Sequence, residues 1–225
     1  MMNELIFIIH SCLVSLCAVG ALVLGKEALT AFISIMCILA NLFVLKQITL
    51  LGYNATTSDA LSIGATIGLN FMLEYYGRAA AQRAIGISFA AIMVYTMLSY
   101  LHLSYVPSTY DLSNAHFIAL LSVMPRILIA SCTVYVIVQV IDYNLYTFLN
   151  YIFKNRYFIM RNYISVIICQ LLDTVLFSFF GLYGIIHNIG HVIMVSYTIK
   201  VILIVLATPF LWLTKKIVPT PKHTS

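Results

Sequence analysis

The sequence predicts an all-α membrane protein, a polytopic bundle of about seven transmembrane helices. Three observations predict it: the composition, the length of the apolar runs and the distribution of basic residues. Of 225 residues, 62% are hydrophobic and 8% are charged, against roughly 45–50% and about 25% in soluble domains. So few polar groups cannot cover a surface in water. We therefore exclude a soluble, a disordered and a disulfide-stabilised chain, and expect residues 1–225 to form a single membrane domain.

Seven apolar runs approach or exceed the roughly 20 residues that a helix needs to cross the hydrocarbon core. Continuous apolar runs favour helices over a β-barrel, whose strands would alternate in polarity. The third run is short and contains Gly64, Gly68, Asn70 and Glu74, so it could be re-entrant, which would leave six spans. The spacing of its two glycines is typical of close helix packing. The runs cover about residues 5–25, 28–50, 58–75, 82–101, 118–141, 162–185 and 190–213.

Basic residues indicate how these runs are oriented, because Lys and Arg accumulate in cytoplasmic loops. When the loops are assigned to alternate sides, nine basic residues fall on one side and none on the other. The N-terminus is then outside, and the C-terminus, with a short basic tail at 215–225, is cytoplasmic. This asymmetry explains the net charge of +5 without a nucleic-acid partner. The nine residues are Lys26, Arg78, Arg83, Lys154, Arg156, Arg161, Lys215, Lys216 and Lys222.

Among the ionisable residues inside the predicted spans we single out five: Lys46, Glu74, Arg126, Asp173 and Lys200. An unpaired charge at the bilayer centre costs about 2.5–3.5 kcal/mol even on lenient scales. We therefore expect these groups to pair or to line a wet cavity, and the default interpretation is a substrate or ion pathway. Asp173 and Lys200 lie near the middle of neighbouring antiparallel runs, so they could pair. Such a pair could also serve only to fix helix packing.

Polar residues recur at helical spacing on four of the runs and could meet at one interior site. In the sixth run they follow an i, i+3, i+7, i+11 pattern. Pro125 and Pro209 remove helix hydrogen bonds and could provide kinks about which the bundle rocks. By run, the polar residues are Asn41 and Lys46 in the second; Ser122, Arg126, Ser131, Thr133, Tyr135 and Gln139 in the fifth; Asn162, Ser165, Cys169, Gln170 and Asp173 in the sixth; and Ser196, Tyr197 and Lys200 in the seventh.

A metal centre and an intramembrane enzyme are both disfavoured. His187 and His191 are four residues apart, but Asn188 stands where a zinc protease motif has its glutamate, and no third ligand is evident. Asp142 and Asp173 fall at different depths, which argues against a catalytic pair. We therefore expect no metal, no other cofactor and no enzymatic activity.

Several motifs occur in order along the chain: Asn41 with Lys46; Asn70-Phe71-Met72-Leu73-Glu74-Tyr75-Tyr76-Gly77-Arg78; Arg126 with Ser131, Gln139 and Asp142; Arg161-Asn162 with Ser165; Gln170-Leu171-Leu172-Asp173-Thr174; and Lys200 with Thr208-Pro209. In this combination they resemble the queuosine precursor transporters, also called the vitamin uptake or VUT family, over about residues 36–215. Asn70 is a departure, because members usually have an acid four residues before the glutamate of Glu-x-Tyr-Gly.

The resemblance implies an importer of a 7-deazaguanine in the cell (inner) membrane. The cargo would be 7-cyano-7-deazaguanine, 7-aminomethyl-7-deazaguanine or queuine. An alternative is the membrane-embedded substrate-binding subunit of a multi-subunit importer. The sequence contains no nucleotide-binding loop, so ATP could drive transport only through partner subunits. We regard such ATP-driven partner subunits as the less favoured possibility. The expected partners are the deazapurine and the lipid bilayer, and the chain could also form a homodimer.

For such a ligand, Asp173 or Glu74 would accept hydrogen bonds from the N1–H and the exocyclic amine. Tyr197 could stack on the flat base, and Lys46 could gate the outer entrance. Arg126 and Lys200 would keep the carboxylates ionised. The remaining polar candidates for the substrate site are Gln170, Gln139, Asn41, Asn70, Asn162 and Ser165.

Overall fold

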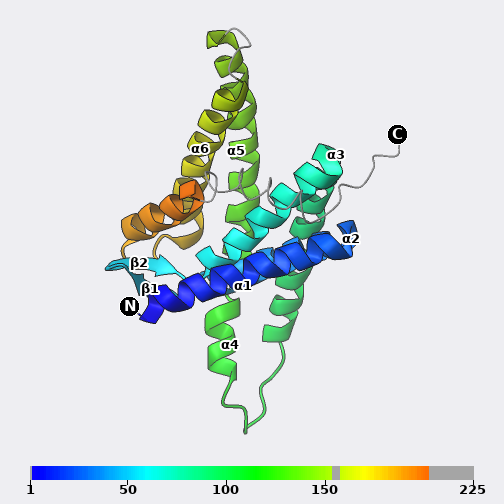
Figure 1. Ribbon diagram of the computed structural model, residues 1–225. Coiled ribbons are helices and arrows are strands. Elements are labelled where there is room, and N and C mark those ends of the chain that lie inside the picture. The colour runs from blue at the N-terminus through cyan, green and yellow to red at the C-terminus, as the bar shows by residue number, and fades with distance from the viewer. Residues whose placement is uncertain (1, 154–157, 203–225) are drawn as a thin grey trace.

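The computed structural model describes residues 2–153 and 158–202, and this part of the chain is mostly helical (Figure 1). A small antiparallel hairpin joins the second and third helices. The helices pack around a core that α1, α2 and α3 share. The elements are α1 (Met2–Leu24), α2 (Lys26–Phe43), β1 (Gln47–Leu50), β2 (Tyr53–Thr56), α3 (Ser58–Leu103), α4 (Asn114–Leu121), α5 (Met124–Ile152), α6 (Phe158–Phe177), the π-helical turn η1 (Ser178–Leu182) and helix 189–202 (Ile189–Ile202).

Five helical stretches within the described residues are long and apolar enough to cross a membrane. One of them, α3, has 46 residues, more than twice the roughly 20 that one crossing needs. A multi-pass membrane protein is therefore confirmed, whereas the count of seven crossings and the orientation of the termini stay predictions. The seventh predicted run is described only as far as Ile202.

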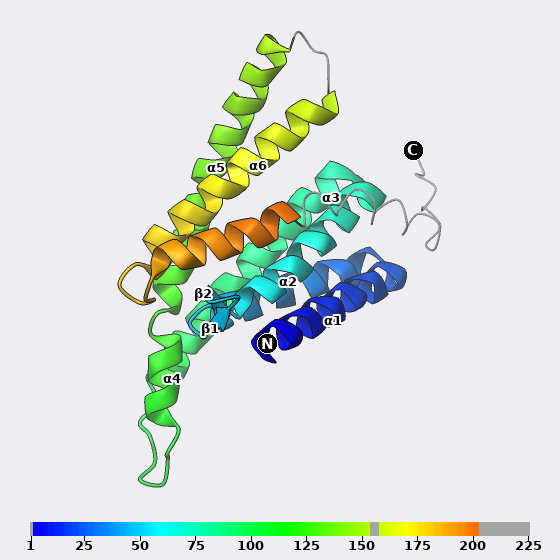
Figure 2. The ribbon, with the colours of Figure 1, turned by 60° about the vertical axis from the view of Figure 1, so that its left-hand side comes forward.

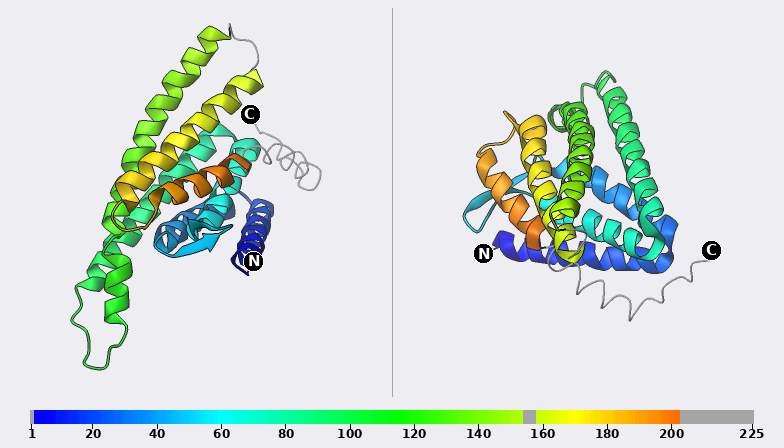
Figure 3. Two further views of the ribbon diagram at one scale, coloured as in Figure 1. Left: turned by 90° about the vertical axis from the view of Figure 1, so that its left-hand side faces the viewer. Right: turned by 90° about the horizontal axis from the view of Figure 1, so that it is seen from above.

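Gly77 divides α3 into the third and fourth predicted runs. Its backbone has φ 81° and ψ 174°, a region that only glycine adopts without strain. The halves 58–76 and 78–103 form a V whose apex lies at Gly77 (Figures 2 and 3). The polar sequence around this apex, including Arg78 and Arg83, agrees with a loop between two crossings.

The second predicted run is wrong at its C-terminal end. The helix ends at Phe43, and residues 47–56 form the β1–β2 hairpin, in which Leu50 pairs with Tyr53. Both residues of the two-residue turn, Leu51 and Gly52, have positive φ, as a tight hairpin turn requires. The apolar residues Ile48 and Leu50 of β1 continue the apolar run of α2, so hydropathy alone concealed the hairpin.

Lys46 is consequently not part of a helix. It lies exposed in the segment between α2 and β1. Nearby, the hairpin is held against the start of α1, because Asn3 donates to the Thr49 carbonyl at 3.0 Å and the Leu51 N–H donates to Glu4 at 3.1 Å.

The fifth predicted run is also divided in the structure. Helix α4 ends at Leu121 and α5 begins at Met124, with Pro125 in its first turn. Proline is well tolerated there because the first amides of a helix have no intrahelical acceptor. The predicted break in helical hydrogen bonding near Pro125 is therefore present, whereas Pro209 lies outside the described residues.

The glycines of the third run allow α3 to approach α1 and α2 closely. A Cβ atom at Gly64 would overlap with the Val14 side chain, and one at Gly68 would lie 2.8 Å from Ile33 Cγ1. The interpretation of the Gly64–Gly68 spacing as a packing motif is confirmed.

Gly64→Ala should destabilise the protein because the added methyl group has no free volume. Overpacking of this kind costs about 1–3 kcal/mol. Gly86→Ala is the matched control on the same helix, since no atom lies within 4 Å of its Cβ position; it should be neutral or stabilising by about 0.5–1 kcal/mol. Thermal unfolding of the purified variants in detergent measures both, and equal melting temperatures would contradict the packing assignment.

The predicted topology is tested with a reporter fused after Ser225. Because the basic residues gather on the side of the C-terminus, we expect a fused fluorescent protein to be bright and fused alkaline phosphatase to be inactive, as in the cytoplasm. The opposite pair of signals would overturn the seven-helix topology. The basic tail at 215–225 itself lies outside the described residues.

Candidate functional site

A cavity of about 350 Å³ lies between α2, both halves of α3, α5, α6 and helix 189–202. This volume is within the roughly 300–1,000 Å³ of small-molecule sites. Hydrophobic side chains form most of its wall, and a few polar groups project into it. Those that the sequence predicted for the substrate site are Asn41, Gln170, Asp173 and Lys200.

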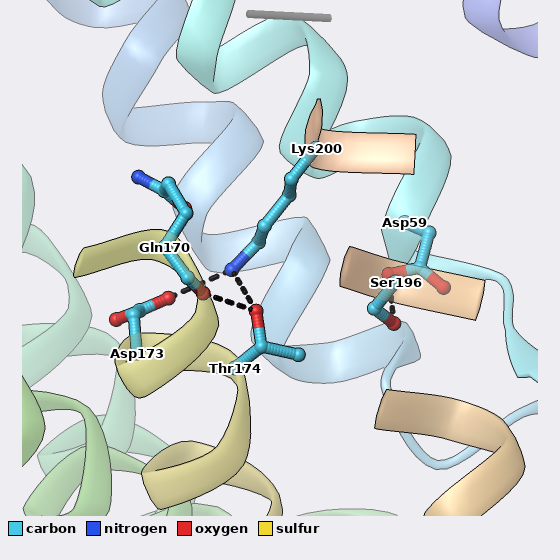
Figure 4. A network of polar contacts seen from close by, with 6 residues as sticks. All are labelled: Asp59, Gln170, Asp173, Thr174, Ser196 and Lys200. Atoms are coloured by element: carbon cyan, nitrogen blue, oxygen red, sulfur yellow. Dashed lines mark hydrogen bonds and ion pairs between the residues drawn. The ribbon is translucent and has the colours of Figure 1, made fainter. Parts of the chain in front are cut away.

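Asp173 and Lys200 form an ion pair on the wall of this cavity (Figure 4). Lys200 Nζ donates to Asp173 Oδ2 at 2.7 Å and to Thr174 Oγ1 at 3.0 Å. Thr174 Oγ1 in turn donates to the backbone carbonyl of Gln170 at 2.7 Å, which fixes the hydroxyl. The side chains of Asp173 and Lys200 are 37% and 23% exposed, so a ligand in the cavity can reach them.

Two amide side chains add neutral donors and acceptors to the same cavity. Asn41 Nδ2 donates to the Cys37 carbonyl at 2.8 Å, which orients the amide and leaves its carbonyl oxygen as an acceptor. Gln170 lies one helical turn before Asp173, so both side chains project from one face of α6. The side-chain amide of Gln170 has no hydrogen bond to another described residue.

An aromatic pair forms another part of the wall. The rings of Phe89 on α3 and Tyr135 on α5 are 5.0 Å apart between centroids and inclined by 58°, and both line the cavity. Tyr197, the residue predicted to stack on a ligand, is half-buried but does not line the cavity.

Arg126 does not reach the cavity. It is exposed, and its guanidinium donates to the Phe180 carbonyl at 3.1 Å and to the Tyr183 carbonyl at 2.6 Å. These carbonyls belong to the turn that ends α6, where backbone acceptors lose their intrahelical partners. Arg126 thus stabilises a helix end, a role that its position in an apolar run did not reveal.

The other predicted site residues also lie outside the cavity wall. Glu74 is exposed and Asn70 is half-buried, both on the first half of α3. Ser165 is only 1% exposed and packs inside the bundle. The side chains of Gln139 on α5 and Asn162 on α6 lie outside the part of the chain that the structure describes.

Asp59 is a buried carboxylate that sequence reasoning missed. It is 7% exposed, accepts a hydrogen bond from Ser196 Oγ at 2.7 Å, and lies 3.5 Å from Thr56 Oγ1. It lies in the first turn of α3, directly after Thr56-Thr57-Ser58. Acidic residues are common at the N-terminal end of a helix, because they interact favourably with its dipole. One signal was available, because Asp59 lies inside the third predicted run, 58–75, where an acid is costly in lipid.

Comparisons with known proteins agree with a membrane transport role. Residues 63–214 match the family described as "Putative vitamin uptake transporter". A protein of Bacillus subtilis (strain 168) named "Probable queuosine precursor transporter" is 27% identical over 206 residues, which cover 89% of each chain. No solved structure matches. Gln170, Asp173 and Lys200 lie within the matched region, whereas Asn41 and Asp59 precede it.

Proposed function

The chain belongs to the vitamin uptake transporter family, and from that premise we propose that it imports a queuosine precursor or the salvage base through the cavity between its helices. The cargo is 7-cyano-7-deazaguanine, 7-aminomethyl-7-deazaguanine or queuine. The name of the Bacillus subtilis relative supports this cargo class, and family membership favours a transporter over an enzyme. The observation that carries the proposal is the accessible Asp173–Lys200 pair on the cavity wall.

The chemistry of Asp173 suits the donor edge of a deazaguanine. This edge carries an N1–H and an exocyclic amine, which a carboxylate accepts in a bidentate manner. Lys200 takes up only part of the capacity of Oδ2, and Oδ1 has no hydrogen bond to another described residue. The neighbouring Gln170 and the carbonyl oxygen of Asn41 are available for the remaining polar atoms.

The aromatic pair suits the flat faces of the same ligand. Aromatic side chains that stack on a base contribute about 1–3 kcal/mol per base. Phe89 on α3 and Tyr135 on α5 line the same cavity as Asp173 but come from other helices. A base held by its edge at α6 could therefore place a face against either ring.

A second candidate function is the membrane-embedded binding subunit of a multi-subunit importer, because a cavity with this chemistry serves binding and transport equally. Purified protein in liposomes separates the two. Uptake of labelled deazaguanines without added subunits supports the carrier, and binding without uptake supports the subunit. Neither binding nor uptake of any of the three bases would overturn the proposal.

A competition assay in cells that cannot synthesise 7-deazaguanines distinguishes among the three candidate cargoes. Guanine is the informative competitor, because it has the same hydrogen-bonding edge but a ring nitrogen in place of the substituted carbon. Weak competition by guanine would show that this ring position, the carbon together with its substituent, contributes to recognition.

A further inference from the structure

Asp59 is a buried acid whose polar contacts suit both of its protonation states. Its described side-chain partners are the hydroxyls of Ser196 at 2.7 Å and Thr56 at 3.5 Å. A hydroxyl donates to an ionised carboxylate and accepts from a protonated one. Asp59 does not line the cavity, although the preceding Ser58 does. It is thus placed beside the ligand site without contacting a ligand there.

Lys200 is the charged group that faces both Asp59 and the cavity. Its ammonium is paired with Asp173 on α6, and its charge also acts on Asp59. Ser196 and Lys200 lie one turn apart on helix 189–202, so one helix face contacts both acids (Figure 4). From the hairpin side, Asp59 meets the neutral Thr56 and Ser58 hydroxyls, which share a hydrogen bond of 2.8 Å. One ammonium therefore pairs with the Asp173 carboxylate and acts through its charge on the Asp59 carboxylate.

The charge balance of these three groups depends on one proton. If both acids are ionised, the set keeps a net negative charge, and the buried carboxylate of Asp59 holds its charge without an ion-pair partner, which is costly. A proton on Asp59 makes the set neutral. Within the described residues, the ion pair is Lys200 with Asp173, and Asp59 has no cation within ion-pair distance. This arrangement is the one expected when Asp59 carries the proton.

We propose that Asp59 is a proton-binding site that couples inward movement of a proton to import of the substrate. This inference rests on the proposed function. A proton from the outer water binds the Asp59 carboxylate, so that Lys200 stays on Asp173 and Oδ1 of Asp173 is presented to the substrate. When the same proton leaves to cytoplasmic water, ionised Asp59 attracts Lys200 on its flexible stem. Asp173 then loses its partner, and the substrate leaves chemically unchanged.

Proteoliposomes test this coupling with tritiated 7-cyano-7-deazaguanine, which is neutral and so does not itself respond to a pH gradient. The membrane potential is held at zero with potassium and valinomycin, and the outside is made one pH unit more acidic. With one proton per substrate, the wild-type accumulation ratio should rise about tenfold. Asp59→Asn, which cannot exchange a proton, should give a ratio near unity while still exchanging internal for external base.

Two further variants keep the test decisive. Asp59→Glu retains a titratable carboxylate and should still accumulate the base under the gradient. Asp111→Asn removes an exposed acid and is the matched control, with wild-type accumulation expected. If Asp59→Asn fails to fold, an Asp59→Glu variant with normal exchange but no accumulation overturns the proposal.

The outcomes separate this inference from the proposed function. Wild-type exchange without any response to the gradient overturns proton coupling and leaves the transporter assignment intact. Gradient-driven accumulation by Asp59→Asn overturns the role of Asp59 alone. If the wild type exchanges none of the three deazaguanines, each tried in turn, the proposed function fails and this inference fails with it.

Discussion

Asp173→Asn is expected to abolish uptake of the deazaguanine while leaving the protein inserted in the membrane. Asparagine can still accept from Lys200, but it cannot offer two charged oxygens to the donor edge of the base. Two lost charge-assisted hydrogen bonds, at about 1.5–3 kcal/mol each, correspond to at least a roughly 100-fold loss of affinity. The measurement is the initial uptake rate of labelled base in cells that lack 7-deazaguanine synthesis.

Two controls separate recognition from folding in this experiment. A fluorescent fusion reports the amount and the monodispersity of each variant in detergent extracts. Thr174→Val removes a hydroxyl that contacts Lys200 but leaves both charges, so it should reduce uptake far less than Asp173→Asn. Wild-type uptake by Asp173→Asn would remove this carboxylate from the site.

The second large effect concerns the Asp173–Lys200 pair as a unit. Lys200→Met or Asp173→Leu leaves the other charge without its partner between helices, and each single change should lower thermal stability in detergent. The double variant removes both charges and should be more stable than the two single losses predict. A coupling of about 0.5–3 kcal/mol is expected for groups in contact, and partial exposure of both side chains favours the lower half of this range.

The double variant also separates the two interpretations of the pair. If the pair only fixed helix packing, restoring stability would restore uptake. If Asp173 contacts the substrate, the double variant should be stable and inactive. Simple additivity of the two single changes would show that Lys200 and Asp173 do not act as a pair.

Some of the site could be predicted because its residues are costly in lipid. Asp173 and Lys200 are charged residues in the middle of apolar runs. Because neighbouring runs must be antiparallel, two residues near mid-span lie at the same depth in the bilayer, and this indicated that they could pair. Asn41 and Gln170 were found by the same reasoning about polar residues at helical spacing. Periodicity, however, reports which face of a helix is polar and says little about which neighbour that face meets.

The residues that were misplaced or missed show this limit. Arg126 looked like an interior charge, but its acceptors are backbone carbonyls more than fifty residues away along the chain. A pattern of side chains in the sequence cannot predict a contact with backbone carbonyls. Asp59 looked like an ordinary acid at a helix start, and its contact with Ser196 on helix 189–202 appears only in the folded chain. The β1–β2 hairpin was hidden because Ile48 and Leu50 of its first strand continue the apolar run of α2.

The sequence by itself determined that this protein resides in the bilayer. Its residues are 62% hydrophobic and form long runs, and so much apolar surface is stable in lipid but not in water. It also divided α3 into two apolar runs, and Gly77 permits the break between them because it can adopt a backbone conformation that other residues cannot. Only the tertiary structure decided which polar groups share a cavity and which one is buried beside it. Helix contacts depend on the shapes of two surfaces at once, and that information is distributed across segments far apart in the chain.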